Sequence, residues 1–241
     1  MCKECGCIEE EPAHDHGQGH RHDHGHTHSH SHHITRTVTL DSRILSKNDE
    51  LAARNRSWLA EHGVVAVNLI SAPGSGKTLL LERTLERVRG RIPSAVIGGD
   101  VQTDNDARRL AGKGAVVRQI ETHGACHLDA DRVGRLLPEV ASGAKLLFVE
   151  NVGNLVCPAA FDLGETFKVA LLSATEGEDK PLKYPALFSV ASVVVLTKMD
   201  LVPHLDWNSN LCRTHLRRIH PGVYIFELSA KTGQGMDAWI D

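Results

Sequence analysis

Short apolar runs that alternate with helix-forming stretches constrain the fold of this chain more than any other feature. The runs place Val, Leu and Ile at consecutive positions, which is typical of strands buried on both faces of a parallel sheet. They span residues 64–70, 94–99, 115–120, 145–151, 167–174, 192–198 and 223–230. The stretches with helical character lie near residues 78–90, 104–112, 128–142, 185–190, 206–219 and 234–240. This alternation predicts an α/β fold with a mostly parallel central sheet and helices on both faces.

The first 33 residues differ from the rest of the chain. Ten of the 16 histidines lie between residues 14 and 33. Residues 1–33 also hold six acidic and two basic residues, net −4, against 24 acidic and 25 basic residues, net +1, in the remainder. Such a segment cannot bury a core, so we expect a tail over residues 1–33 that is disordered without metal, and a single domain over residues 34–241.

The start of this domain is predicted in two parts. Residues 35–45 have the pattern of a short extended segment. Ser46 is a plausible N-cap with acidic residues in the turn after it, so a helix is predicted from Ser46 to His62.

Composition excludes several classes of protein. Lysine and arginine are scattered among acidic residues, which argues against a nucleic-acid surface and against a polybasic membrane anchor. No run of about 18 apolar residues occurs, and no secretory leader is recognisable, so a cytoplasmic location is expected. Six cysteines, three of them clustered at the start of the chain, are too few and too clustered for a disulfide framework in such a chain, and metal binding competes with redox chemistry as their role.

A glycine-rich loop joins the first predicted strand to the next helix. Its sequence from Ser71 to Thr78 is SAPGSGKT, which is a P-loop in the expected context, although Ser71 replaces the usual first glycine. Its N–H groups would face phosphate oxygens, the lysine would reach the β and γ phosphates, and the threonine hydroxyl would bind Mg²⁺. The alternative is a strand-to-helix turn without ligand. The predicted phosphate-binding residues are Gly74, Ser75, Gly76, Lys77, Thr78 and Leu79.

The sequence Thr197-Lys198-Met199-Asp200 follows the predicted strand 192–198 and resembles the Asn-Lys-x-Asp motif of GTPases, with Thr in place of Asn. A carboxylate at Asp200 would accept from the N1–H and 2-amino groups of guanine, whereas adenine lacks the amino group. Lys198 would lie along the base. A second loop, of Ser229, Ala230 and Lys231, resembles the segment whose backbone contacts guanine O6. Each loop alone is also compatible with an ordinary strand end, but three loops in this order favour GTP.

Two carboxylates end predicted strands between these motifs. Asp100 follows the run 94–99, and Glu150 lies at the end of the run 145–151. Mg²⁺ bound to phosphates usually keeps one or two carboxylate contacts, so Lys77, Thr78, Asp100 and Glu150 form the predicted catalytic set, and the last three are the predicted magnesium ligands. The alternative role for each acid is a helix cap or loop carboxylate. No Gln follows the glycine of Glu-x-x-Gly, so slow intrinsic hydrolysis is expected.

Sulfur and imidazole ligands lie in two further loops. Cys126 and His127 follow the run 115–120, and Cys157 follows Glu150. Two thiolates and one imidazole favour Zn²⁺ or Ni²⁺ and leave one position open, which a symmetric partner could fill. Buried small cysteines and a hydrogen-bonded loop histidine are the alternative. Cys212 lies in a predicted helix and is expected in the core or on the surface.

The terminal C-x-x-C-G-C places Cys2, Cys5 and Cys7 within six residues, where they could enclose Ni²⁺ or Zn²⁺. A flexible redox-active terminus is the alternative. The interleaved histidines of residues 14–33 would add weaker imidazole sites; a purification tag, the other explanation, usually has consecutive histidines.

Together these motifs resemble the hydrogenase nickel-incorporation GTPases, the HypB family of the P-loop class that also includes the urease accessory GTPase. The most specific segments are SAPGSGKT, GDVQTDNDA, ETHGACHLDA, ENVGNLVCP and TKMDL, and the resemblance covers about residues 38–241 and the terminal cysteines. It implies a metal site of Cys126, His127 and Cys157 at a nucleotide-dependent dimer interface. It also implies a nickel site at Cys2, Cys5 and Cys7, and nickel storage by the histidines.

The expected function is that of a GTP-hydrolysing nickel metallochaperone that couples GTP binding and hydrolysis to nickel delivery to [NiFe]-hydrogenase. The implied partners are a second copy of the chain, a HypA-type metallochaperone and the hydrogenase large-subunit precursor. A urease-type nickel GTPase, and a nickel or zinc storage protein with a regulatory nucleotide site, remain alternatives at this stage.

Overall fold

The fold is a seven-stranded parallel sheet with helices on both faces, as the sequence predicts. The computed structural model describes residues 32–100, 110, 112–122 and 124–241, with side chains described from residue 43 onward apart from that of Asp100. The strands are β1 (Val65–Ser71), β2 (Ser94–Asp100), β3 (Ala115–Glu121), β4 (Leu146–Glu150), β5 (Phe167–Ser173), β6 (Val193–Thr197) and β7 (Tyr224–Glu227). The helices are α1 (His32–Glu61), α2 (Lys77–Val88), α4 (Ala130–Val140), α5 (Cys157–Ala160), α6 (Lys180–Lys183), α7 (Pro185–Val190), α8 (Ser209–Ile219) and α9 (Met236–Ile240), with 3-10 turns η1 (Ala174–Glu176) and η2 (Met199–His204).

Strand order determines where a ligand can lie. The order across the sheet is β3-β2-β4-β1-β5-β6-β7, and each neighbouring pair in the described chain is parallel. β1 is therefore central, with Leu69 level with Glu150 on β4 and with Val169 on β5. In parallel sheets of this type ligands bind beyond the carboxyl ends of the strands, and the loops after β1, β4 and β6 meet at that edge.

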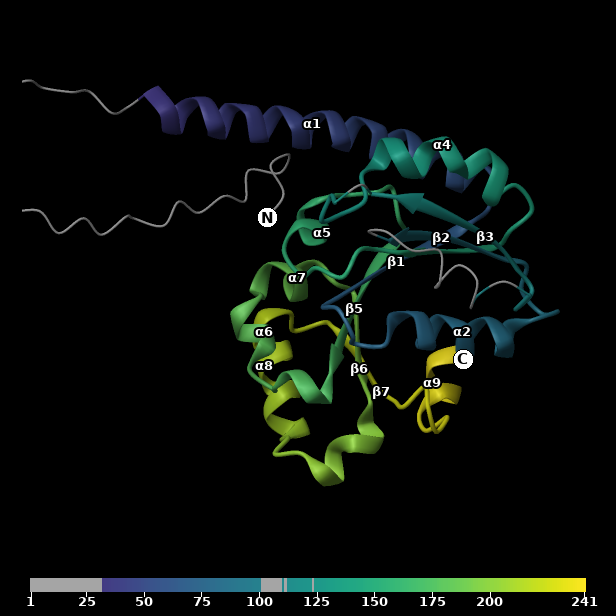
Figure 1. Ribbon diagram of the computed structural model, residues 1–241, viewed down its shortest axis with the longest axis vertical. Coiled ribbons are helices and arrows are strands. Elements are labelled where there is room, and N and C mark those ends of the chain that lie inside the picture. The colour runs from purple at the N-terminus through teal and green to yellow at the C-terminus, as the bar shows by residue number, and fades with distance from the viewer. Residues whose placement is uncertain (1–31, 101–109, 111, 123) are drawn as a thin grey trace, which may run out of the picture.

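The core lies on both sides of β1 because alternate side chains of a strand point to opposite faces. Val67 and Leu69 pack in the apolar cluster that includes Leu80, Leu81 and Leu85 of α2. Ala66 and Ile70 face the other side, in two further apolar clusters. Figure 1 shows α1 and α4 together along one face of the sheet and α2 with α9 along the other. Asn68, which is fully buried, lies on the same face as Ala66 and Ile70.

The prediction for residues 35–45 is wrong, because α1 is one continuous helix of 30 residues that begins at His32. Ser46 consequently lies inside α1 and does not cap it. From residue 43 onward, where the side chains of this helix are described, the buried positions are Asn48, Ala52, Asn55 and Leu59, which follow helical spacing against the neighbouring α4. Once such a packed segment is helical, each further residue needs only its own backbone to be fixed, so the helix extends through a sequence whose local pattern is extended.

Several predictions fall outside the described residues. They are the disordered tail with Cys2, Cys5, Cys7 and most of its histidines, the side chain of Asp100, and most of the predicted helix at 104–112. Within the described part of the chain, no helix is long and apolar enough to cross a bilayer.

Candidate nucleotide and metal sites

The loop between β1 and α2 has the geometry of a phosphate-binding turn. Gly74 and Gly76 have φ angles of 74° and 94°, a region that glycine adopts readily, and Gly76 is the N-cap of α2. The first N–H groups of α2 therefore face the edge of the sheet, where the helix dipole favours an anion. A cavity of about 480 Å³ opens there, lined in part by Gly74, Lys77, Thr78 and Glu150.

Ser71 replaces a glycine and has a contact of its own. The Lys77 ammonium donates to the Ser71 hydroxyl at 2.8 Å, and that hydroxyl donates to the Ala72 carbonyl at 2.7 Å. Lys77 is 9% exposed, so its charged end lies within the loop and close to the cavity. Serine in place of the usual first glycine of the P-loop thus adds a contact to Lys77 and still allows the phosphate-binding turn.

Thr78 and Glu150 come together at this cavity, as predicted from the sequence. The Thr78 hydroxyl donates to Glu150 Oε1 at 2.7 Å. Hydroxyl and carboxylate oxygens are the ligands that Mg²⁺ prefers, so this pair fits a magnesium ion bound to phosphates. Asp100 is the last residue of β2, two residues beyond Gly98, which is level with Glu150. The backbone of Asp100 therefore reaches the same edge of the sheet.

The loop after Glu150 packs against the phosphate loop. A Cβ atom added at Gly153 would lie 3.0 Å from the Pro73 ring and 3.1 Å from Pro73 Cα, so these two loops approach closely and a larger residue would have to displace Pro73 by a few tenths of an ångström. The next residue, Asn154, accepts a hydrogen bond from the Val156 N–H at 2.8 Å. Its side chain is therefore held within its own loop.

The two loops that resemble guanine-binding segments are joined to each other and to the phosphate loop. The Thr197 hydroxyl donates to the Ser75 carbonyl at 2.7 Å, so the threonine that replaces asparagine still binds the phosphate loop. The Met199 N–H donates to the Leu228 carbonyl at 3.2 Å, directly before Ser229. Lys198 has a φ of 57°, the one positive value for a non-glycine residue in the described chain.

The remaining members of these loops occupy the same edge. Asp200 lies in η2, half-buried, Ser229 is buried, and Lys231 is exposed in the turn that follows β7. Ala230 packs at the margin of the α2 cluster. All the predicted base-binding residues are therefore in loops at the carboxyl edge.

Cys126, His127 and Cys157 form a cluster, although 31 residues separate the two cysteines. One ligand atom from each residue lies within 4.8 Å of the other two. The two sulfurs are 2.9 Å apart, and the Cys126 sulfur is 3.6 Å from His127 Nδ1. Two sulfurs and one imidazole fit Zn²⁺ or Ni²⁺ and leave a fourth position for another ligand. In the part of the chain that the structure describes, no other His, Cys, Asp or Glu group meets this criterion.

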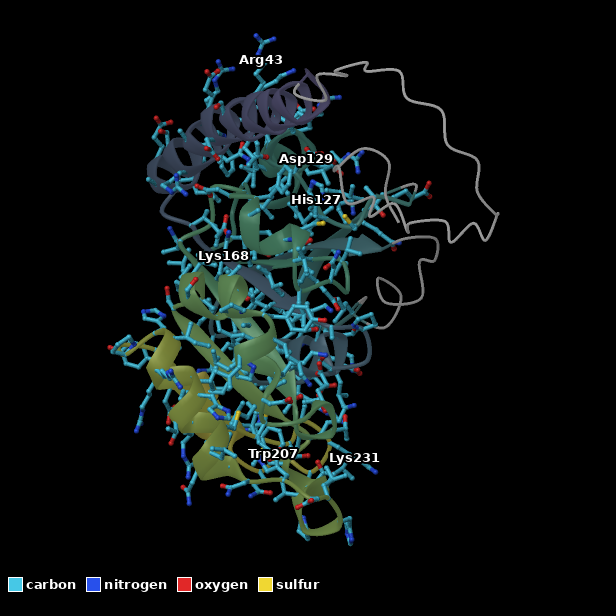
Figure 2. The ribbon with its side chains drawn as sticks, turned by 90° about the vertical axis from the view of Figure 1, so that its left-hand side faces the viewer. Arg43, His127, Asp129, Lys168, Trp207 and Lys231 are labelled. Carbon is cyan, nitrogen blue, oxygen red and sulfur yellow. The ribbon has the colours of Figure 1, made fainter. Side chains whose placement is uncertain are left out.

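The metal cluster and the base-binding loops lie far apart. Figure 2 shows His127 close to Asp129 on the side nearer α1, whereas Lys231 is toward the opposite end of the molecule. The His127 ring stacks on Phe161, with centroids 3.8 Å apart. Phe161 follows α5, the short helix that begins at Cys157, so this contact also joins the two metal-ligand segments.

Two asparagines of α1 hold these segments together, and neither is among the site residues predicted from the sequence. Asn48 accepts from the Ala130 N–H at 2.9 Å and donates to the Asp162 carbonyl at 2.7 Å. Asn55 donates to the carbonyls of Ala130 at 2.8 Å and Leu163 at 3.0 Å. The signal was present in the sequence, because two asparagines seven residues apart share the helix face that is otherwise apolar.

An ion pair at the surface also joins α1 to the segment after α5. Arg56 binds both carboxylate oxygens of Asp162, at 2.8 and 2.7 Å. Burial acts to raise the pKa of Asp162, but hydrogen bonds from Arg56 and from the Gly164 N–H outweigh it and keep that pKa below its usual value. Burial raises the pKa of the neighbouring Glu165, although Lys168 opposes this.

Cys212 is not part of the metal cluster. It is fully buried among apolar residues beside α7 and the β5 and β6 strands, and burial raises the pKa of its thiol to about 12. Of the two expected places, core or surface, the structure shows the core. A thiol with such a pKa stays protonated at neutral pH, whereas a metal ligand must lose its proton.

Comparisons with known proteins agree with this geometry. A family model described as "CobW/HypB/UreG, nucleotide-binding domain" matches residues 65–227. The hydrogenase maturation factor HypB of Rhizobium leguminosarum bv. viciae is 50% identical over 210 residues, which cover 86% of this chain and 70% of that protein.

Two solved structures are also similar. HypB from Archaeoglobus fulgidus is 41% identical, with a TM-score of 0.77 over 81% of this chain and 96% of that one. HypB from Helicobacter pylori, solved in complex with nickel, is 36% identical, with a TM-score of 0.76 over 80% of this chain and 92% of that one. This chain therefore belongs to the CobW/HypB/UreG family of P-loop GTPases and, within that family, to the HypB hydrogenase maturation factors.

Proposed function

We propose that the protein hydrolyses GTP to GDP and phosphate and uses this reaction to control delivery of nickel to [NiFe]-hydrogenase. One observation supports the coupling above all others. The eight-residue segment from Glu150 to Cys157 has at one end the carboxylate that binds Thr78 in the phosphate site, and at the other end a sulfur of the metal cluster. A rearrangement of this segment would therefore act on both sites.

The phosphates would be bound by groups that line the cavity, and the base by loops elsewhere along the carboxyl edge of the sheet. Lys77 would reach the β and γ phosphates, with the N–H groups of Gly74 to Leu79 around them. Thr78, Glu150 and Asp100 would hold Mg²⁺, which when bound neutralises negative charge on the phosphate oxygens. Asp200, with Lys198 and the Ser229–Lys231 loop, would select guanine.

We expect hydrolysis to be slow. A residue that orients water commonly follows the glycine of this loop in fast GTPases. Here Asn154 follows Gly153, and its side-chain oxygen is engaged by the Val156 N–H. A slow reaction suits a switch in which each state persists long enough for metal or partner exchange.

The metal is cargo in this proposal. Ni²⁺ would bind Cys126, His127 and Cys157, and Zn²⁺ fits the same donors. A second copy of the chain would complete the site in a GTP- or metal-dependent dimer. The H. pylori relative in complex with nickel supports this metal. The terminal Cys2, Cys5 and Cys7 and the histidine tail would bind and store further nickel.

The proposed pathway and partners follow from family membership. Within a hydrogenase maturation pathway, the expected partners are a HypA-type metallochaperone that exchanges nickel and the hydrogenase large-subunit precursor that receives it. We propose a cytoplasmic location.

The test measures Ni²⁺ affinity by equilibrium dialysis of the full chain with GDP and with a non-hydrolysable GTP analogue. A Cys126→Ala/Cys157→Ala variant measures the Ni²⁺ that the tail binds. Because the wild type and the variant have the same tail, this amount is subtracted from the Ni²⁺ bound by the wild type. We expect the cluster-dependent affinity to differ between the two nucleotides. Equal affinities would refute the coupling. Phosphate release that persists unchanged in Lys77→Ala would refute the proposed hydrolytic site. The remaining explanation would then be a nickel or zinc storage protein with a regulatory nucleotide site.

A further inference from the structure

An amide in the middle of the central strand is unusual, because both faces of β1 are buried. Asn68 is fully buried, and its neighbours on the same face, Ala66 and Ile70, belong to apolar clusters. A buried amide without hydrogen bonds would be destabilising, so its partners define what the residue does. Those partners lie in the loops around the metal cluster.

The amide belongs to a line of polar side chains, of which all but the half-buried Lys168 are buried. Asn151 Nδ2 donates to Asn68 Oδ1 at 3.3 Å, and Asn68 Nδ2 donates to Glu165 Oε1 at 3.2 Å. Glu165 accepts from the Leu163 N–H at 2.6 Å and forms an ion pair with Lys168 at 3.7 Å. This line, Asn151–Asn68–Glu165–Lys168, runs across β1 from the segment after β4 to the start of β5.

Asn151 is the member of the line that joins the nucleotide site to the metal site. It directly follows Glu150, and its oxygen accepts from the Val152 N–H at 3.0 Å and from the Leu128 N–H at 3.1 Å. Leu128 directly follows His127. One oxygen atom therefore accepts hydrogen bonds from two loops. One is the loop that starts at Glu150, and the other carries the metal ligands Cys126 and His127.

The other end of the line reaches the helix that begins at the third ligand, Cys157. The Lys168 ammonium donates to the carbonyls of Ala159 at 2.9 Å and Phe161 at 3.1 Å, in and after the helix that begins at Cys157. Phe161 in turn stacks on His127. In Figure 2, Lys168 lies nearer to His127 than to Trp207.

We propose that Asn151 is the positioning residue through which the nucleotide state of the Glu150 loop sets the arrangement of Cys126 and His127. The inference rests on the proposed function and names the contact that couples its two sites. Movement of Glu150 toward or away from the phosphates displaces Asn151, its oxygen changes its bond to the Leu128 N–H, and the adjoining ligands change their distance from Cys157. Energetic coupling of this kind acts in both directions, so bound metal changes nucleotide affinity by the same factor.

The coupling factor separates this role from a merely structural one. It is the ratio of the Ni²⁺ affinities of the cluster with a non-hydrolysable GTP analogue and with GDP. A residue that only supports the fold changes both affinities alike and leaves the ratio intact. A residue that transmits the nucleotide state reduces the ratio toward one.

The first experiment uses the unmodified chain. Hydrogen exchange of the Leu128 amide is measured with GDP and with the GTP analogue. We expect its protection to differ by at least about fivefold, the lower end of typical coupling factors. The Leu211 amide, which binds the Asn208 side chain at 3.0 Å in α8, is the control and should not change. Equal protection of Leu128 in both states would overturn the proposal even if every variant failed to fold.

The second experiment uses Asn151→Ser. The serine oxygen is one bond closer to the backbone than the asparagine oxygen, so it cannot span to Leu128, and serine also lacks the Nδ2 group that donates to Asn68. We expect the coupling factor, about 5 to 150 in a typical coupled protein, to fall below about 2. Asn154→Ser makes the same change three residues further on, where the side chain bonds only within its loop, and should keep the wild-type factor.

The outcomes are distinct. A wild-type coupling factor of one refutes the coupling in the proposed function, and this inference with it. A wild-type factor well above one that persists in Asn151→Ser overturns only the role of Asn151. Loss of the factor in Asn154→Ser as well would show that any change in this loop suffices, and would also overturn the specific role.

Discussion

The phosphate site and the metal site share the segment from Glu150 to Cys157 but are built in different ways. The phosphate site is largely one continuous stretch, in which Lys77 binds Ser71 six residues earlier and the N-terminus of α2 supplies the N–H groups. The metal site combines two loops whose cysteines are 31 residues apart. Its loops are fixed by residues that bind no metal, chiefly Asn48 and Asn55 of α1.

This difference indicates how each site should respond to change. A local site tolerates alterations elsewhere and fails when its own residues are replaced. An assembled site also depends on distant contacts, because small shifts of either loop separate the ligands. The same dependence makes the metal site suited to regulation, since any state that moves one loop alters the ligand geometry.

The largest effect expected is that of Lys77→Ala. Loss of a buried cation from the phosphate site should lower kcat/KM for GTP by about two to three orders of magnitude, the usual result of removing one electrostatic stabiliser of a transition state. Phosphate release measures this, and Lys145→Ala, at an exposed lysine, is the control. Metal affinity without nucleotide should stay the same. A large loss of metal affinity would show that the phosphate site is not independent.

Cys157→Ala should have the complementary effect. Loss of one of three ligands should weaken Ni²⁺ binding at the cluster by at least about 100-fold, since even removal of outer-shell contacts costs 10- to 100-fold. GTP turnover without metal should change little. Cys212→Ala is the matched control, because that cysteine is buried outside the cluster. Equal nickel affinity in Cys157→Ala and Cys212→Ala would show that Cys157 is not a ligand of the metal site.

Asp200→Asn tests the base-binding part of the nucleotide site. Hydrogen bonds to charged groups contribute about 1.5–3 kcal/mol, so GTP affinity should fall by roughly 10- to 150-fold. The new amide can donate to the C2 carbonyl of xanthine, so affinity for xanthosine triphosphate should rise. Nucleotide titration measures both changes, and Asp206→Asn, at an exposed position, should alter neither. Unchanged base preference would show that Asp200 does not contact the base.

Asn55→Ala tests the dependence of the metal site on α1. Two buried carbonyls, of Ala130 and Leu163, would lose their donor, at a cost of about 1–3 kcal/mol in the free energy of unfolding. Denaturant unfolding measures this, with Asn210→Ala on the exposed side of α8 as the control. Nickel affinity should decrease while nucleotide affinity is retained. A decrease in both would mean that α1 supports the whole domain alike.

Arg56→Gln should have the smallest effect, below about 1 kcal/mol, because the pair with Asp162 is largely exposed. The pKa of Asp162 is lowered in the folded protein. The stability that the ion pair contributes is therefore fully present above the pKa of the unfolded chain, about 4, and is lost as the pH falls through the pKa of the folded protein. The difference from wild type in the free energy of unfolding should therefore be largest near pH 7 and shrink as the pH falls below the unfolded value. Arg54→Gln is the control, and a difference that does not shrink on acidification would exclude this pair as its source.

Local patterns were sufficient for much of the fold. The seven apolar runs correspond to the seven strands, and the helix expected at 185–190 is α7. The helix expected from residue 206 begins at Ser209, because the Asn208 side chain caps it by accepting from the Leu211 N–H. Residues 35–45 were mispredicted because packing of the following turns extends α1 through them.

The sequence alone determined the features that depend on neighbours along the chain: strand periodicity, the phosphate loop with Lys77 and Thr78, and the candidate ligands Cys126, His127 and Cys157. Only the tertiary structure decided that these ligands meet, and that Asn48, Asn55 and Asn151 hold the segments that carry them. A hydrogen bond between residues 23 or 75 positions apart, such as Leu128 to Asn151 or Asn55 to Ala130, leaves no periodic signal. Such contacts follow from the order of the strands and from the need of every buried amide for a partner.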